Sequence, residues 1–249
     1  MKNLLKRLGV RVLILSRSRS ETIRTHKLLP DFIEVLVPKS QKAAYAERIP
    51  NPIVTCPDDV KGLGMLRNWV LDNFDDETIV MVDDDIRVCI CKTGYRTRNI
   101  TDPLEFLQVI ANIAVMAKDA GCHCFGMSQT DIRKYNPTEP FKLSTWVGCV
   151  IGVIGRKYRF RDDPFKVDID FTLQNLLVDR IVWVDDRYYC YQARDNNRGG
   201  NAEFRSKEGF KQSVDTLLQK WGKYLKMKMH QGQIGLSIQV KRKAVINES

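Results

Sequence analysis

The stretch TIVMVDDDI, residues 78–86, decides the fold of this chain. It joins a short apolar, β-branched run, which is typical of a buried strand, to three consecutive carboxylates. A similar apolar run, residues 10–15, leads into the arginine- and serine-rich segment 16–20. In open α/β sheets, ligands bind beyond the carboxyl ends of the strands. The two polar segments are therefore predicted to lie at the same edge of one sheet.

Further apolar runs and helical patterns alternate along the rest of the chain. Strands are predicted at 32–37, 53–56, 122–127, 146–154 and 180–184, and a last helix at 212–225. A helix is predicted to begin near Gly64, and a longer one to begin with Asp102 as N-cap and Pro103 in its first turn and to stop at Gly121. The buried stripe predicted for that longer helix contains Leu104, Leu107, Ile110, Ile113, Ala114 and Ala117. Short apolar strands alternating with helices indicate an α/β fold, with a mostly parallel central sheet and helices on both faces.

Composition places the chain among globular proteins. It has 249 residues, of which 43% are hydrophobic and 28% charged, and no apolar run approaches the ~20 residues of a membrane span. The basic start followed by residues 10–15 superficially resembles a signal peptide, but the run is short and contains Arg11. Seven cysteines without a CxxC pair predict reduced thiols in a cytoplasmic protein. The C-x-C pairs Cys89/Cys91 and Cys122/Cys124 are expected to pack inside strands and not to bind zinc.

The net charge of +10 is concentrated at the two ends. Residues 1–29 carry eight Lys or Arg against one Glu, and residues 201–249 carry ten against four acidic residues, whereas the centre is slightly acidic. Basic ends favour a polyanionic partner such as nucleic acid. The alternative is that these ends are solvated and only aid solubility.

The polar segments contain the side chains that bind metal ions and phosphates. Asp83, Asp84 and Asp85 raise one another's pKa values unless a cation neutralises them, and carboxylates are usual ligands of Mg²⁺ or Mn²⁺. Ser16, Arg17 and Arg19 can bind a nucleotide phosphate. Glycines at a helix start, in the stretch KGLGMLRN at 61–68, can turn backbone N–H groups toward an anion. The alternatives are a solvated acidic turn and a basic surface turn. Neither a P-loop nor a Rossmann glycine motif is present.

The order of these motifs resembles that of GT-A glycosyltransferases over residues 10–200. The resemblance implies that a D-x-D at a strand end holds Mn²⁺ or Mg²⁺ against the diphosphate of a nucleotide sugar, here a UDP-sugar. The metal ligands implied are Asp85 and Asp83, with Asp83 also near the ribose. The implied donor-binding residues are Ser16, Arg17, Arg19, Gly64, Arg67, Asn68, Asp83 and Asp84.

A second acidic pair, in KVDIDFTLQ at 166–174, resembles the family element that opens a helix behind the acceptor site. It implies that Asp168 is the catalytic base of an inverting enzyme, with Asp170 as the other candidate; Val167 stands where the family usually has Glu. A third metal ligand is expected after residue 185. His230 is the only histidine there, and Asp195, near a possible lid loop at Gly199-Gly200, is the alternative.

The closer resemblance is to phage glycosyltransferases associated with TET/JBP oxygenases, which modify hydroxymethylpyrimidines. It implies that the partner is double-stranded DNA with hydroxymethylated bases, without a membrane, in the host cell cytoplasm if the protein is phage-encoded. Residues 1–200 are expected to form the GT-A-like domain, and 201–249 a basic helical extension packed on or flanking it. The competing hypotheses are a glycan, lipid or protein acceptor, nucleotidyl transfer, and a non-catalytic nucleic-acid-binding protein.

Overall fold

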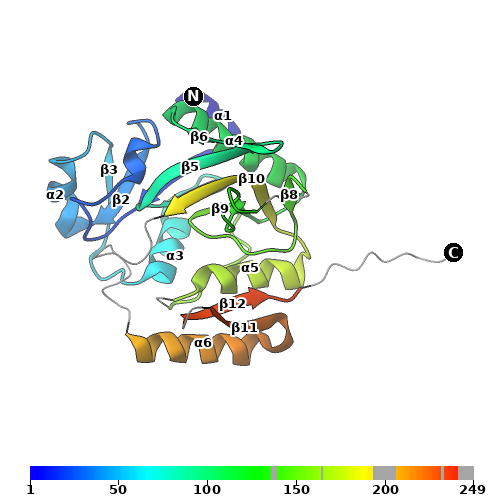
Figure 1. Cartoon of the computed structure of the whole chain (residues 1–249). Helices are drawn as coiled ribbons and strands as arrows, with labels where there is room; N and C mark the ends of the chain where they lie inside the picture. The colour runs from blue at the N-terminus through cyan, green and yellow to red at the C-terminus, as the bar shows by residue number, and fades with distance from the viewer. Residues whose placement is uncertain (136–138, 164, 193–205, 231–232, 241–249) are drawn as a thin grey trace.

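The computed structural model describes residues 1–135, 139–163, 165–192, 206–230 and 233–240, and a ten-stranded sheet forms its centre (Figure 1). The strand order is β3 (Ile53–Cys56), β2 (Glu34–Pro38), β1 (Val10–Leu15), β4 (Thr78–Asp83), β9 (Val150–Ile154), β7 (Cys124–Ser128), β10 (Trp183–Gln192), β5 (Ile86–Thr93) and β6 (Arg96–Ile100), with β8 (Phe141–Lys142) paired to β10. Strands β1 to β4, β6, β7 and β10 run in one direction, whereas β5, β8 and β9 run in the other. The predicted mostly parallel α/β sheet is confirmed.

Both faces of the central strands are buried, which explains their continuous apolar sequences. Successive side chains of a strand point to opposite faces. Alternate residues of β1 and β4 accordingly belong to two separate clusters: Val10, Val12, Ile14, Val80 and Val82 to one, and Leu13, Leu15, Ile79 and Met81 to the other. The sheet is therefore the middle layer of three.

Helices cover the two faces unequally. Helices α1 (Lys2–Leu8) and α4 (Pro103–Asp119) pack on one face, with α2 (Lys42–Ala46) at its edge; α3 (Leu63–Asn73) and α5 (Val167–Val178) pack on the other (Figure 1). The predicted N-cap is confirmed, because the Asp102 carboxylate accepts a hydrogen bond from the backbone N–H of Leu104 at 2.9 Å. Leu104 itself is 48% exposed, so its place in the buried stripe was wrongly predicted; the other five residues of the stripe are buried.

The described part of the basic extension forms a further layer against α5 (Figure 1). It contains α6 (Lys207–Trp221), a short 3₁₀ turn and the hairpin of β11 (Leu225–His230) and β12 (Gln233–Ile238). Leu217 and Leu225 are buried in the same cluster as the apolar side chains of α3 and α5. The helix predicted at 212–225 therefore starts five residues earlier and ends before the hairpin, which the sequence analysis did not identify.

Several strands also differ from the prediction. Strand β10 continues to Gln192, beyond the apolar run at 180–184, because its outer half pairs with β5 as well as with β7. The β5–β6 hairpin was not predicted, since much of β6 is exposed and polar. All seven cysteines are free and buried, as the packing interpretation expected. Among the helices that the structure describes, none is long and apolar enough to cross a membrane.

Candidate active site

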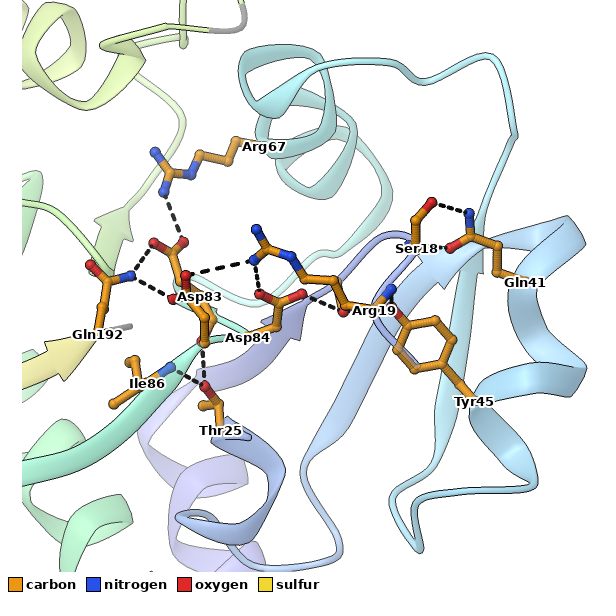
Figure 2. A network of polar contacts seen from close by, with 12 residues as sticks. Ser18, Arg19, Thr25, Gln41, Tyr45, Arg67, Asp83, Asp84, Ile86 and Gln192 are labelled. Carbon is orange, nitrogen blue, oxygen red and sulfur yellow. Dashed lines mark hydrogen bonds and ion pairs between the residues drawn. The ribbon is translucent and has the colours of Figure 1, made fainter. Parts of the chain in front are cut away.

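The three carboxylates at the end of β4 lie at the carboxyl edge of the sheet, where they meet the end of β10 (Figure 2). The Gln192 side-chain N–H₂ group donates a hydrogen bond to Asp83 at 3.0 Å and another to Asp85 at 2.8 Å. The side-chain amide of Gln192 thus lies between the carboxylates of Asp83 and Asp85, which are two residues apart in the sequence. Gln192 was missed by the sequence analysis, because it ends a mixed, aromatic-rich strand whose length was underestimated.

The electrostatics of this turn are unfavourable without a cation. The pKa of Asp83 is raised to about 7, chiefly by burial; Arg67 opposes the shift, and the charges of Asp85 and Asp84 contribute to it. Burial also raises the pKa of Asp84, against the effect of Arg19. The site therefore favours the binding of positive charge, whether a proton or a metal ion. Among the described residues, no group of three or more His, Cys, Asp or Glu has the geometry to hold a metal by itself.

Of the three aspartates, Asp84 is the one that holds the neighbouring loops together. It is 4% exposed, accepts a hydrogen bond from the Ser16 hydroxyl, and forms an ion pair with Arg19 at 2.5 Å. The Tyr45 hydroxyl lies 2.6 Å from the Ser16 oxygen and accepts the backbone N–H of Arg19 at 2.9 Å. Arg19 also lies 3.6 Å from Asp85. These contacts fix the turns after β1 and β4 to each other, as the sequence predicted from their shared edge (Figure 2).

Other residues of the predicted donor site hold neighbouring loops. Arg17 donates hydrogen bonds to the carbonyl oxygens of Val60 at 2.8 Å and Asp58 at 3.1 Å. Asn68 exchanges two hydrogen bonds with the backbone of Phe160, at 2.8 and 2.9 Å.

Gly64 has a related packing role at the start of α3. A Cβ atom placed on it would lie 1.8 Å from the Arg161 carbonyl oxygen, so only glycine allows this close approach. With Asn68, it binds the loop that precedes α5 to the first turns of α3. In this arrangement the side-chain amide of Asn68 is already hydrogen-bonded to backbone groups.

Among the predicted donor-binding residues, Arg67 has the most buried donors without a hydrogen-bond partner in the described structure. It is 1% exposed, and one of its terminal nitrogens lies 3.5 Å from Asp83. Its Nε and Nη1 atoms are buried without a hydrogen-bond partner among the described residues, although the guanidinium lies 5.3 Å from the centre of the Phe160 ring. Buried polar groups are almost always hydrogen-bonded, so these donors indicate a ligand with acceptor oxygens.

The two carboxylates of α5 have different environments. Asp170 is fully buried and accepts hydrogen bonds, each of 2.8 Å, from Lys220 and Trp221 of α6 and from Gln174. The Asp168 carboxylate is partly buried and has no hydrogen bond or ion pair within the described ranges. Of the two, Asp168 is therefore the one whose carboxylate oxygens are not engaged by another described side chain.

A chain of hydrogen bonds brings the start of α5 to Asp83–Asp85, which we call the carboxylate turn. The backbone N–H of Asp83 donates to the carbonyl of Cys149 at 2.9 Å, just before β9. Two residues upstream, the N–H of Val147 donates to the Thr172 hydroxyl at 3.3 Å, and that hydroxyl donates to the Asp168 carbonyl at 2.8 Å. The first turns of α5 thus lie at the same end of the sheet as Asp83.

Replacing Asp170 by asparagine is expected to destabilise the protein by about 1–3 kcal/mol. The substitution removes the charge that pairs with Lys220 and presents an amide where three donors converge, so it weakens the attachment of α6. Thermal unfolding measures the loss, and limited proteolysis should show earlier cleavage near α6. Donor binding at the carboxylate turn should persist in the folded variant. An unchanged melting temperature would contradict this structural role.

Asp195 and the Gly199-Gly200 loop lie outside the described residues, as do residues 201–205 and 241–249 of the predicted basic extension. The side chain of His230 is not described either. The third metal ligand therefore stays a prediction.

Comparison with known proteins gives a family match and shared folds. The family model described as TET-associated glycosyltransferase matches residues 10–200. Two GT-A structures share the fold. Glucosyl-3-phosphoglycerate synthase from Mycobacterium tuberculosis, in complex with Mg²⁺ and uridine diphosphate, is 11% identical, with 96% of this chain and 92% of that chain covered and a TM-score of 0.51. Mannosyl-3-phosphoglycerate synthase from Rubrobacter xylanophilus is 12% identical, with 96% and 88% covered and a TM-score of 0.50. No curated protein matches the sequence significantly.

Proposed function

This chain belongs to the TET-associated glycosyltransferase family and is a nucleotide-sugar-dependent glycosyltransferase, and we propose that its acceptor is a hydroxymethylated pyrimidine in phage double-stranded DNA. We further propose that the donor is a UDP-sugar and that the reaction takes place in the cytoplasm. The observation that carries the donor site is the buried, partly unpartnered guanidinium of Arg67 beside the carboxylate of Asp83.

The carboxylate turn fits a divalent metal ion. Mg²⁺ is usually held by one or two carboxylates together with substrate phosphates and waters, so a complete protein cage is not needed. Asp85 and Asp83 supply the carboxylates, and Gln192 already places an amide between them. An amide can turn to present its oxygen, so Gln192 is a candidate third ligand alongside Asp195. The metal in the M. tuberculosis synthase structure supports this proposal.

The proposed reaction is a single displacement at the anomeric carbon. Asp168 accepts the proton of the acceptor hydroxyl while the hydroxyl oxygen forms a bond to C1 of the sugar. The bond from C1 to the diphosphate oxygen breaks, and UDP leaves with its electron pair. Arg67 binds the phosphate oxygens, and Arg19 keeps Asp84 and Asp85 in place. A bound metal ion supplies charge neutralisation for the departing diphosphate.

The acceptor proposal rests on the family and on the basic character of the chain. A hydroxymethyl group is small and uncharged, so affinity must come from the surrounding phosphates. The seven free cysteines are consistent with a reducing compartment such as the cytoplasm. A glycan, lipid or protein acceptor is the alternative, and it would leave the donor site unchanged.

Duplex DNA that contains 5-hydroxymethylcytosine is expected to be a better acceptor than the free nucleoside, by about tenfold or more in kcat/KM at 50 mM salt, because only the duplex offers phosphate contacts. Transfer is measured as UDP release and as a mass increase of the base, with a UDP-sugar and Mn²⁺ supplied. The same duplex without hydroxymethyl groups is the control and should accept no sugar. Equal activity on nucleoside and duplex would remove DNA from the proposal and leave a small acceptor.

A further inference from the structure

The basic residues of the N-terminal segment do not form one surface. Lys2, Lys6 and Arg7 lie on α1, which precedes β1 and is therefore at the end of the sheet opposite the carboxylate turn. Arg11 forms ion pairs with Asp76 and Glu34, both at 2.5 Å. Figure 1 shows that α1 and α6 are on opposite sides of the molecule. The charge imbalance in the sequence therefore does not by itself mark the DNA-binding face.

A pocket beside the carboxylate turn gathers three cations that have no such partners. Arg24, Lys27 and Arg87 are exposed, and none of them forms an ion pair or side-chain hydrogen bond within the described part of the chain. They line a cavity of about 280 Å³ together with Glu21, Thr22, Ile23 and Leu28. Glu21, the acidic residue in the lining, already pairs with Arg48 at 3.1 Å. Arg87 belongs to β5 and lies in the slightly acidic centre of the sequence. The charge imbalance between the ends and the centre therefore did not indicate Arg87 as a candidate binding residue.

Hydrogen bonds join the segment that carries Arg24 and Lys27 to the carboxylate turn. The carbonyl of Asp84 accepts the backbone N–H of Arg24 at 2.9 Å. Thr25 donates its hydroxyl to the Asp83 carbonyl at 2.6 Å and accepts the backbone N–H of Ile86 at 3.0 Å. In Figure 2, Thr25 approaches the turn from the side opposite Arg67. A ligand in the pocket is therefore fixed relative to Asp83–Asp85, but on the far side of the turn from Arg67.

The chemistry of the pocket fits the phosphodiester backbone of a nucleic acid. Small-molecule sites usually measure about 300–1,000 Å³, so this cavity suits one part of a larger ligand. Two guanidinium groups can fork onto phosphate oxygens, and the lysine adds a point charge. The Thr22 side chain supplies a hydroxyl for a further hydrogen bond. The Arg67 side already has a candidate ligand in the donor, so a second anion site on the other side points to the acceptor.

We infer that the pocket of Arg24, Lys27 and Arg87 binds a backbone phosphate of the acceptor DNA and thereby positions the target base at the carboxylate turn. The inference rests on the proposed DNA acceptor. It assigns the binding of that DNA to this pocket and not to the basic ends of the chain as a whole.

The test compares two triple variants of the full chain with the same loss of charge. One replaces Arg24, Lys27 and Arg87 by alanine; the control replaces Lys2, Lys6 and Arg7, which are exposed on α1. Fluorescence anisotropy measures binding to an unmodified duplex between 50 and 200 mM KCl. The slope of log K against log salt changes by about 0.9 for each phosphate contact. We expect the slope of the pocket variant to be smaller in magnitude than the wild-type slope by about 2–3. The slope of the α1 variant should equal that of the wild type. Both should retain the wild-type melting temperature and UDP binding in the presence of Mn²⁺.

Three outcomes would overturn the inference, and they are distinguishable. An equal loss of slope in both variants would show that only total charge matters. A loss of UDP binding in the pocket variant alone would assign the pocket to the donor. A pocket variant with the wild-type slope, in an enzyme that glycosylates duplex DNA, would reject the pocket while the proposed function stands. If the wild-type protein neither binds nor glycosylates duplex DNA, the proposed acceptor itself fails.

Discussion

Replacing Asp85 by alanine is expected to abolish sugar transfer while the fold stays intact. Asp85 lies two residues after Asp83, the last residue of β4, and its carboxylate contacts Gln192 at 2.8 Å and Arg19 at 3.6 Å. A bound metal contributes several kcal/mol of charge stabilisation to such a reaction, which corresponds to a fall of at least about 10²-fold in rate. The free energy of unfolding should change by no more than about 1 kcal/mol, or about 2–4 °C in Tm, because lost contacts are offset by reduced repulsion within the triplet.

Ligand-dependent unfolding separates loss of metal from loss of fold. A ligand at 100 times its Kd stabilises a protein by about 2.7 kcal/mol, so UDP with Mn²⁺ should raise the wild-type Tm by several degrees. In Asp85→Ala the Mn²⁺-dependent part of that shift should disappear. Asp59→Ala is the matched control, because Asp59 is an exposed carboxylate in the loop after β3. Wild-type turnover of Asp85→Ala with added metal would show that the metal assignment is wrong.

Asp168→Asn is expected to lower kcat by about 10²–10⁴-fold, the usual contribution of a positioned general base. Asparagine keeps the size of the side chain but cannot take the proton. The carboxylate has no hydrogen bond or ion pair in the described structure, so Tm should stay near the wild-type value. Donor affinity should change little, because the donor contacts proposed for Arg67 and the carboxylate turn remain. The measurements are single-turnover kinetics and UDP titration.

Asp170→Asn provides the contrast for this prediction, because the two carboxylates are two residues apart and have opposite environments. The Asp168 variant should lose rate and keep stability, whereas the Asp170 variant should lose stability through α6. A normal rate in Asp168→Asn, together with a slow but stable Asp170→Asn enzyme, would exchange the two roles. A normal rate in both would favour a mechanism without an aspartate base on α5.

The sequence predicted the central features of the site because each depends on local patterns. The apolar run 78–82 followed by three aspartates specifies a buried strand with a polar end, and the same holds for 10–15 followed by Ser16. Parallel pairing of these two strands, Leu15 beside Asp83, then brings their ends together. The ion pair of Arg19 with Asp84 follows from this register, and so does the hydrogen bond from Ser16.

What the sequence could not give depends on long-range contacts. The roles of Asn68 and Gly64 depend on the backbone of residues 160–161, which is more than 90 residues away in the sequence and packs against α3. Asp168 and Asp170 look alike in sequence, and only the docking of α6 separates a paired carboxylate from an unpaired one.

By itself, the sequence determined the layered α/β fold, the carboxylate turn and the position of that turn beside the Ser16–Ser20 segment. It could do so because hydrophobic periodicity and strand ends are local properties. Only the tertiary structure decided that Gln192 stands between Asp83 and Asp85, and that Arg67 is buried with unpartnered donors. It also decided that Arg24, Lys27 and Arg87 share one pocket while the charges of α1 lie elsewhere. The physical reason is that burial, pairing and charge clustering depend on which distant segments pack together, and short-range sequence patterns do not encode that packing.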